Sequence, residues 1–387
     1  MLFDIERDRN VQVDTGADVA VYHPVLKERG GAEKVVLEYA RNSRHDVTVF
    51  CLSYVPEKTF DGFDDVEVRE LGAGGRPRNM VDFGLRFGLG SVFFSLPDEF
   101  DALLVSETGL GSAAVLRDQD VPTVCYCHTP LRLNLPEFRD TYLEEAGFPK
   151  SLLLRVGMRF HSLIERVGWS RFEHVFANSE NTERRVLEKG LCNQEDIEVL
   201  NPGVEIPEPS SGHDSYFLYP SRFRRYKRHE LAIDAFEEAD LPGDFDLVLA
   251  GSAQEQDYIE ELRNRAGEGV SMELDVEEDR WQELYSNAHT VLFCAENEDW
   301  GMIPMEAAAH GKPVVAVDEG GPQESVRHGE TGFLVEPEPE AMARRKEELA
   351  VNSEVRDRMS RKAREHAEDN SWEEFAARID KQFEYLT

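Results

Sequence analysis

A short basic segment stands out in a chain of 387 residues with 77 acidic side chains and a formal net charge of −34. SRFRRYKRH (221–229) holds four arginines and one lysine without an acid, and it follows an apolar run that predicts a strand. Arginine offers paired hydrogen bonds to phosphate oxygens, and lysine offers a compact positive charge. Because so acidic a surface repels a polyphosphate elsewhere, the segment predicts a phosphate site; a solvated basic face is the alternative.

A second candidate, ENEDWGMIPMEAAAHG (296–311), leads from a predicted strand into a predicted helix. Glu298 lies before the helix and Glu306 inside it, a spacing that recurs by chance in so acidic a chain. Their position after a strand is more informative, because carboxylates accept paired hydrogen bonds from vicinal hydroxyls. The free amides of Gly301, Met302 and Ile303 would face an intervening anion. The pattern favours a sugar nucleotide, and a capped helix with a core-facing Glu306 is the alternative.

Three further strand ends carry glycine-rich or polar turns. Gly30 and Gly31 precede a helix that starts at Ala32, where amides can approach an anion, although a plain turn has the same pattern. His128 follows another strand and could contact a sugar hydroxyl or a phosphate, or be a structural histidine. DEGGPQESV (318–326) repeats the glycine-pair arrangement, and we expect it to shape a cleft wall.

The elements that must position these residues alternate along the chain. Short apolar runs recur between amphipathic stretches, which predicts parallel sheets covered by helices on both faces. The predicted strands are 17–23, 46–52, 101–107, 123–128, 174–179, 216–221, 244–251, 270–275, 290–295 and 313–318. A segment rich in Pro, Gly and Ser, 201–215, divides them into two groups. The sequence therefore predicts an α/β protein of two doubly wound, Rossmann-like domains, with ligands at the strands' carboxyl ends.

Composition excludes several classes of function. The net charge of −34 argues against nucleic acid as a partner, and no apolar run is long enough to span a bilayer. The N-terminus lacks the apolar core of a secretory signal, and five scattered cysteines indicate a reducing, cytoplasmic location without a metal site. Lysine provides only ten of the 43 basic residues, which together with the acidity suggests the molar salt of a halophilic archaeon; an ordinary acidic cytosolic protein is the alternative.

Several motifs together resemble the retaining glycosyltransferases of family 4, which have the GT-B fold. The most specific match is EDWGMIPME, GKPVVA and GGPQESVRHGETGFLV, within residues 291–335. GGAE, YCHTPLR, FANS, NPGV and SRFRRYK occur in the expected order, so the resemblance spans about 17–386. It implies two domains, 1–203 on the acceptor side and 204–370 on the nucleotide-sugar side, facing an interdomain cleft. The last helix, 371–387, would return to the first domain.

The resemblance also assigns roles to residues. Arg222 and Lys227 would bind the donor diphosphate and stabilise the departing nucleotide, while Glu306 would hold the ribose. Glu298 would contact the transferred sugar with the amides of Gly301–Ile303. His128 would contact the sugar from the first domain, and the Gly30–Gly31 turn would lie near the phosphates and the acceptor.

The family implies transfer of a hexose from a nucleotide sugar to a hydroxyl acceptor, with retention. GDP-mannose is the favoured donor, with UDP-glucose and UDP-N-acetylglucosamine as alternatives. A lipid-linked oligosaccharide for protein N-glycosylation and a surface polysaccharide are the candidate acceptors. A sugar-nucleotide epimerase or phosphorylase of the same fold would carry other C-terminal motifs. A silent donor-binding partner is disfavoured because every expected functional position is filled.

Two motifs point to other chemistry. DFD (244–246) resembles the metal-binding Asp-x-Asp of another glycosyltransferase fold, but it opens a strand instead of ending one. TGLGSAA (108–114) resembles a dinucleotide fingerprint, but no convincing acidic partner follows at the next strand end. We therefore predict neither a metal nor NAD as a cofactor.

Two apolar, net basic segments depart from the acidic background. They are 72–95 and 149–172, and the second is amphipathic, with Arg155, Arg159, Arg166 and Arg171 among apolar residues. Such segments suit peripheral contact with an anionic membrane that carries a lipid-linked acceptor. A buried interdomain or dimer helix with extended arginines is the alternative.

Overall fold

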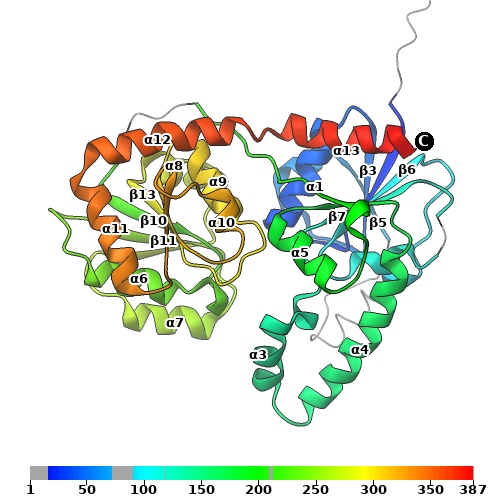
Figure 1. Cartoon of the computed structure of the whole chain (residues 1–387), viewed down its shortest axis with the longest axis horizontal. Coiled ribbons are helices and arrows are strands. Elements are labelled where there is room, and N and C mark those ends of the chain that lie inside the picture. Colours follow the sequence, from blue (N-terminus) through cyan, green and yellow to red (C-terminus); the bar gives the residue numbers. More distant parts are fainter. Residues whose placement is uncertain (1–15, 72–89, 118, 209–211, 387) are drawn as a thin grey trace, which may run out of the picture.

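Two parallel sheets, each with its own core, organise the chain (Figure 1). The computed structural model describes residues 16–71, 90–117, 119–208 and 212–386. The first sheet has the order β5-β3-β1-β6-β7-β8-β9, and the second has the order β12-β11-β10-β13-β14-β15. The strands β2 and β4 pair with each other in a separate two-stranded sheet. In sequence, both fall among the strands of the first sheet.

The strands of the first group are β1 (Asp18–Tyr22), β2 (Val25–Leu26), β3 (Asp46–Cys51), β4 (Ser53–Tyr54), β5 (Glu67–Glu70), β6 (Ala102–Glu107), β7 (Thr123–Cys127), β8 (His174–Ala177) and β9 (Ile197–Val199). Those of the second are β10 (Tyr216–Pro220), β11 (Asp246–Gly251), β12 (Val270–Leu274), β13 (Thr290–Phe293), β14 (Val314–Val317) and β15 (Gly332–Val335). Every predicted strand is present. The sequence pattern did not predict β2, β4, β5, β9 and β15, which have at most four residues each.

The first sheet is buried on both faces because its strands are apolar at successive positions. Val19 and Val21 of β1 join one core cluster, and Ala20 and Tyr22 join the other. Side chains alternate across a strand, so a continuous apolar run serves two layers. The helices in the described residues of this half are α1 (Gly31–Asn42), α3 (Pro136–Ala146), α4 (Lys150–Trp169) and α5 (Glu180–Glu188).

The last helix crosses from the second sheet's side to the first (Figure 1). Trp372, Phe375, Ile379 and Phe383 of α13 (Trp372–Leu386) recur at helical spacing and pack into the core cluster that contains α1. Tyr39 of α1 donates a hydrogen bond to Asp380 across a distance of 3.0 Å. The chain's end thereby covers one face of the first sheet.

Within residues 212–386, seven helices surround the second sheet. They are α6 (His229–Glu238), α7 (Gln256–Arg265), α8 (Glu278–Asn287), α9 (Met302–Ala309), α10 (Pro322–Ser325), α11 (Pro339–Val351) and α12 (Ser353–Glu368). Among the described helices, none is long and apolar enough to cross a membrane. The helices α3 and α4 form a hairpin that projects away from both sheets (Figure 1).

Candidate active site

A cleft of about 1390 Å³ is lined by residues of both halves of the chain. Loops that follow β1, β7, β10, β11, β12 and β13 converge there, which is where parallel sheets place ligands. All the site residues predicted from the sequence line this one cleft: Gly30, Gly31, His128, Arg222, Lys227, Glu298, Gly301, Met302, Ile303 and Glu306. None of residues 318–326 is a lining residue itself. The segment packs behind the lining loop, where the Gly321 amide donates a hydrogen bond of 2.8 Å to Glu298 O, so it supports the cleft wall without forming its surface.

The basic segment after β10 supplies three cations to the cleft, Arg222, Arg224 and Lys227. Arg222 Nη1 lies 2.9 Å from Glu28 Oε2, so this ion pair joins the two halves of the chain. Lys227 is buried, and its Nζ pairs with Glu298. Its ammonium also lies 5.1 Å from the ring centre of Tyr226 and 5.7 Å from that of Phe293. A cation fixed in this way needs little reorganisation to meet a phosphate.

Glu298 is ionised because cations surround it. Burial by itself opposes ionisation, but the Lys227 ammonium and the Arg132 guanidinium outweigh that cost. They hold the pKa of Glu298 below its usual value. Arg132 Nη2 approaches Glu298 Oε1 to 3.1 Å. The carboxylate is therefore available at neutral pH as an acceptor for hydroxyl groups.

The helix α9 starts at the cleft with an unusual backbone geometry. Gly301 precedes it with a φ of 88°, a left-handed conformation that residues with a Cβ rarely adopt. The amides that follow are the unpaired donors of a helix N-terminus. Glu306, one turn further on, accepts a hydrogen bond of 2.6 Å from the Tyr285 hydroxyl, and burial raises its pKa.

The glycine pair before α1 acts through its lack of side chains. A Cβ on Gly31 would lie 2.9 Å from Met302 Sδ, so the glycine lets α1 and α9 approach across the cleft. A Cβ on Gly30 would lie 2.5 Å from Glu33 Oε2. Burial raises the pKa of this Glu33 carboxyl to about 7. The Glu33 carboxyl, from the first turn of α1, therefore lies next to the N-terminus of its own helix.

His128 belongs to a buried chain of polar groups. Its Nε2 lies 2.9 Å from Ser106 Oγ, and His23 Nδ1 lies 2.9 Å from the same hydroxyl. Burial lowers the pKa of His128 to about 3, so the ring is neutral at pH 7. Because one hydroxyl hydrogen serves two rings, Ser106 donates to one histidine and accepts from the other.

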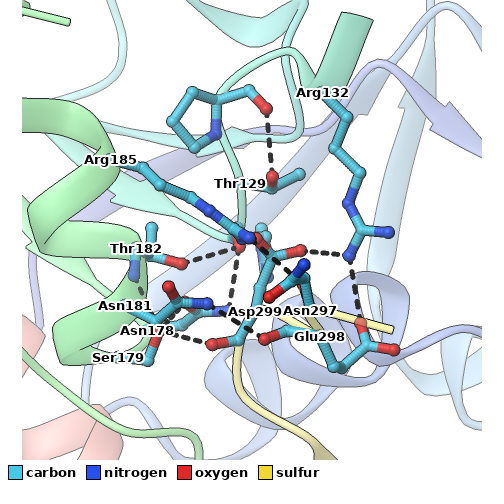
Figure 2. A network of polar contacts seen from close by, with 12 residues as sticks. Thr129, Arg132, Asn178, Ser179, Asn181, Thr182, Arg185, Asn297, Glu298 and Asp299 are labelled. Carbon is cyan, nitrogen blue, oxygen red and sulfur yellow. Dashed lines mark hydrogen bonds and ion pairs between the residues drawn. The ribbon is translucent and has the colours of Figure 1, made fainter. Parts of the chain in front are cut away.

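A network that the sequence did not reveal ties the Glu298 loop to the first half of the chain (Figure 2). Asp299 pairs with Arg132 at 2.5 Å and, through its other oxygen, with Arg185 at 2.5 Å. Both Arg185 and Asp299 are buried. The backbone oxygens of this loop also accept hydrogen bonds, from Ser179 at 2.7 Å and from Asn181 at 3.0 Å.

A second contact reinforces this network from α10. The two carboxylate oxygens of Glu324 accept hydrogen bonds from the backbone amides of Glu180 and Asn181, at 2.7 and 2.9 Å. An acidic side chain is favourable there because these amides begin α5. Only FANS (176–179) pointed to this region in the sequence, since the contacts join residues more than 100 positions apart.

Two alternative chemistries find no support in the geometry. The turn at 108–114 wraps the buried carboxylate of Glu107, which accepts hydrogen bonds from the amides of Gly109, Gly111 and Ser112. A side chain of the protein itself thus occupies the amides that a dinucleotide phosphate would need. Asp246, in DFD, opens β11 and lies outside the cleft. Within the described ranges, no group of three His, Cys, Asp or Glu could hold a metal ion.

These features define a class: two Rossmann-like domains of a GT-B fold that face each other across one cleft. A profile described as Glycosyltransferase Family 4 matches residues 29–207, and one described as Glycosyl transferases group 1 matches residues 206–366. The chain therefore belongs to the glycosyltransferases of family 4, and it is a nucleotide-sugar glycosyltransferase.

Similar proteins include Alpha-1,3/1,6-mannosyltransferase ALG2 of Homo sapiens, 27% identical over 369 residues that cover 83% of this chain and 84% of the relative. The ALG2 protein of Rhizomucor pusillus is 28% identical and covers 94% of this chain and 90% of the relative. Among solved structures, Anabaena Alr3699/HepE in complex with UDP and glucose has a TM-score of 0.75 at 20% identity, covering 96% and 100% of the two chains. Sucrose-phosphate synthase of Thermosynechococcus elongatus has a TM-score of 0.73 at 18% identity, covering 96% and 99%.

Proposed function

We propose that this protein is a retaining transferase that moves mannose from GDP-mannose to a lipid-linked or polysaccharide acceptor. The observation that carries the proposal is the convergence, in one cleft, of paired cations, a helix N-terminus and two separate carboxylates. A nucleotide sugar has a matching order of groups: hydroxyls at both ends and a diphosphate between them.

Different residues of the cleft bind the diphosphate, the ribose and the sugar of the donor. Arg222 and Lys227 bind the diphosphate, together with the amides of Gly301, Met302 and Ile303. Glu306, which Tyr285 orients, holds the ribose hydroxyls. Glu298 binds hydroxyls of the transferred sugar. Neutral His128 and the Gly30–Gly31 turn contact the sugar and phosphates from the first domain.

The reaction follows from these positions without a protein nucleophile. The acceptor oxygen bonds to the anomeric carbon while the bond from that carbon to the phosphate oxygen breaks. The departing phosphate takes the acceptor's proton, so a glycoside and a nucleoside diphosphate result. Negative charge grows on the leaving oxygen, and Arg222 and Lys227 stabilise it. The cleft also holds both reactants in position, which removes much of the entropic barrier.

The identity of the donor is proposed separately from the class of reaction. Mannose is supported by the ALG2 relatives, which are named as mannosyltransferases and are 23–28% identical to this chain. A UDP-sugar is the second candidate, because the structurally similar HepE was solved with UDP-glucose.

The location proposed for the protein is the cytoplasm. All five cysteines are free thiols, as expected for a protein in a reducing compartment.

A panel of nucleotide sugars tests this function. GDP-mannose, UDP-glucose and UDP-N-acetylglucosamine are incubated with the wild type and with Glu298→Ala, and nucleoside diphosphate release is measured. We expect release from GDP-mannose and its loss in the variant. Release from a UDP-sugar alone would replace the donor but keep the class. Donor binding without release, even with added lipid-linked and polysaccharide acceptors, would favour a silent donor-binding partner.

A further inference from the structure

The outer face of α4 is apolar and uncovered. Leu152, Leu153, Val156, Phe160, Leu163 and Val167 are each 50–65% exposed. Their spacing places all of them on one side of the helix. Phe148, at the turn between α3 and α4, is 87% exposed and extends this stripe to the tip of the hairpin. Contiguous apolar surface of this kind on a helix marks an interaction site.

The exposed charged side chains of α4 are all positive. Lys150, Arg155, Arg159 and Arg166 are exposed, and none of them pairs with a carboxylate in the part of the chain that the structure describes. The one acid of α4, Glu165, is buried and pairs with Lys189 at 2.8 Å. The exposed charge of α4 is therefore opposite in sign to the chain's net charge of −34.

The other face of α4 is anchored firmly. Met158 and Trp169 are buried, and a Cβ on Gly168 would lie 2.1 Å from Ser112 O. Asn134 donates hydrogen bonds to His161 and Ser162 near the middle of the helix. The outer face of α4 is exposed, so the predicted alternative of a buried interdomain helix is wrong for this face. Arg171 is half-buried beyond the helix and does not belong to the exposed row.

We propose that α4 docks the protein on an anionic membrane surface, with its apolar stripe in the interface and its cations on the lipid phosphates. The hairpin projects from both sheets, so a flat surface can reach it (Figure 1). Tyr142 of the neighbouring α3 lines the cleft, so an acceptor held in the same membrane is brought to the active site. A twofold contact of this face with itself would instead bring the cations of two copies together. The predicted segment 72–95 adds only Phe93, 66% exposed, since its residues 72–89 lie outside the described ranges.

Vesicle flotation with the full chain tests the proposal. Vesicles of phosphatidylglycerol and of phosphatidylcholine are compared at about 0.15 M ionic strength, where charges act over about 8 Å. The first variant, Arg155→Glu with Arg159→Glu, reverses two exposed cations. Its control, Arg358→Glu with Arg361→Glu, makes the same change on exposed positions of α12. A third variant, Phe160→Ser with Leu163→Ser, removes part of the stripe, and circular dichroism verifies each fold.

We expect the wild type and the control to float with phosphatidylglycerol only. The Arg155→Glu, Arg159→Glu variant should bind at least about tenfold less, and so should the serine variant. Equal flotation with both lipids, no flotation of the wild type, or unchanged binding in the variants would overturn the proposal. A concentration-dependent dimer that the serine variant abolishes, without vesicle binding, would assign the face to a second copy. Because flotation needs no donor, this result is independent of the proposed transferase activity.

Discussion

Lys227 illustrates, at the scale of a single residue, how the cleft prepares for a negative charge. It is buried, paired with Glu298 and held against two aromatic rings. Loss of one fixed donor to a developing anion typically lowers turnover by about 10²–10³-fold. We expect Lys227→Ala to lower kcat for nucleotide release by about that factor.

Arg225→Ala is the matched control, because Arg225 lies in the same basic segment but pairs with Glu261 on the surface, outside the cleft. Exposed pairs of this kind contribute little to stability. Its kcat should stay within about twofold of the wild type. Equal losses in both variants would show that the segment matters only for its net charge.

His229 provides a test of stability against pH. It is fully buried, stacked on Phe223, and burial lowers its pKa to about 3. The unfolded chain protonates this histidine below pH of about 6.5, whereas the folded protein does not. The wild type therefore loses stability as the pH falls from about 6.5 toward 3, by up to about 1.4 kcal/mol per pH unit from this group.

His229→Phe lacks this titration and keeps a ring of similar shape. Urea unfolding at pH 7 and pH 5 should show a smaller loss of stability in the variant, by about 2 kcal/mol. The same loss in both proteins would contradict a buried neutral histidine at this position.

Residues such as Glu298 and Glu306 were predictable because each follows a strand in a local pattern. Asp299 and Arg185 were not, since neither has a neighbour in sequence that signals their contact across 114 positions. Arg132 is an intermediate case: it lies in the motif YCHTPLR, but its two carboxylate partners belong to the other half of the chain.

At the scale of elements, α9 begins at the cleft, directly after a glycine in a left-handed conformation. Gly301 and Gly311 lie at its two ends, with φ of 88° and 64°, and an added Cβ has room at both. Alanine in a left-handed conformation costs about 1–2 kcal/mol at either position. Gly301→Ala should also lower kcat/KM for the donor by about tenfold or more, because it disturbs the amides that we propose to bind the phosphates.

Gly311→Ala separates the two effects. Gly311 does not line the cleft, so this variant should lose similar stability while keeping the activity of the wild type. Thermal unfolding and initial rates measure the two quantities. If both variants lost activity equally, the N-terminus of α9 would have no special role.

The strands show why part of the fold was predictable. Central strands such as β1 and β13 are apolar at nearly every position because both of their faces are buried. The edge strands β5 and β9 contain EVRE and IEV, too short and too polar to give that signal. Their place is set by pairing with a neighbouring strand, which no local pattern encodes.

At the scale of the whole molecule, Glu324 joins the two halves through the start of α5. Glu324→Ala should increase the radius of gyration measured by X-ray scattering, because two hydrogen bonds to a charged group are lost. Since the proposed donor contacts come from both domains, the KM of this variant for the donor should rise about tenfold while kcat changes less.

Gln323→Ala is the control, because the side-chain amide of Gln323 donates its hydrogen bonds to Asp318, in its own half. It should leave both the radius of gyration and KM unchanged. An unchanged shape in both variants would mean that the other interdomain pairs suffice. The high-salt habitat inferred from the net charge of −34 stays a prediction of composition.

The most direct test of the central claim is the anomeric configuration of the first product. Proton NMR follows the hexose that is released when water replaces the acceptor, with the donor that the panel selects. Transfer with retention at this cleft predicts that the α-anomer, the configuration of the donor, forms first and that Glu298→Ala releases none. Initial accumulation of the β-anomer, or undiminished release by the variant, would contradict the account.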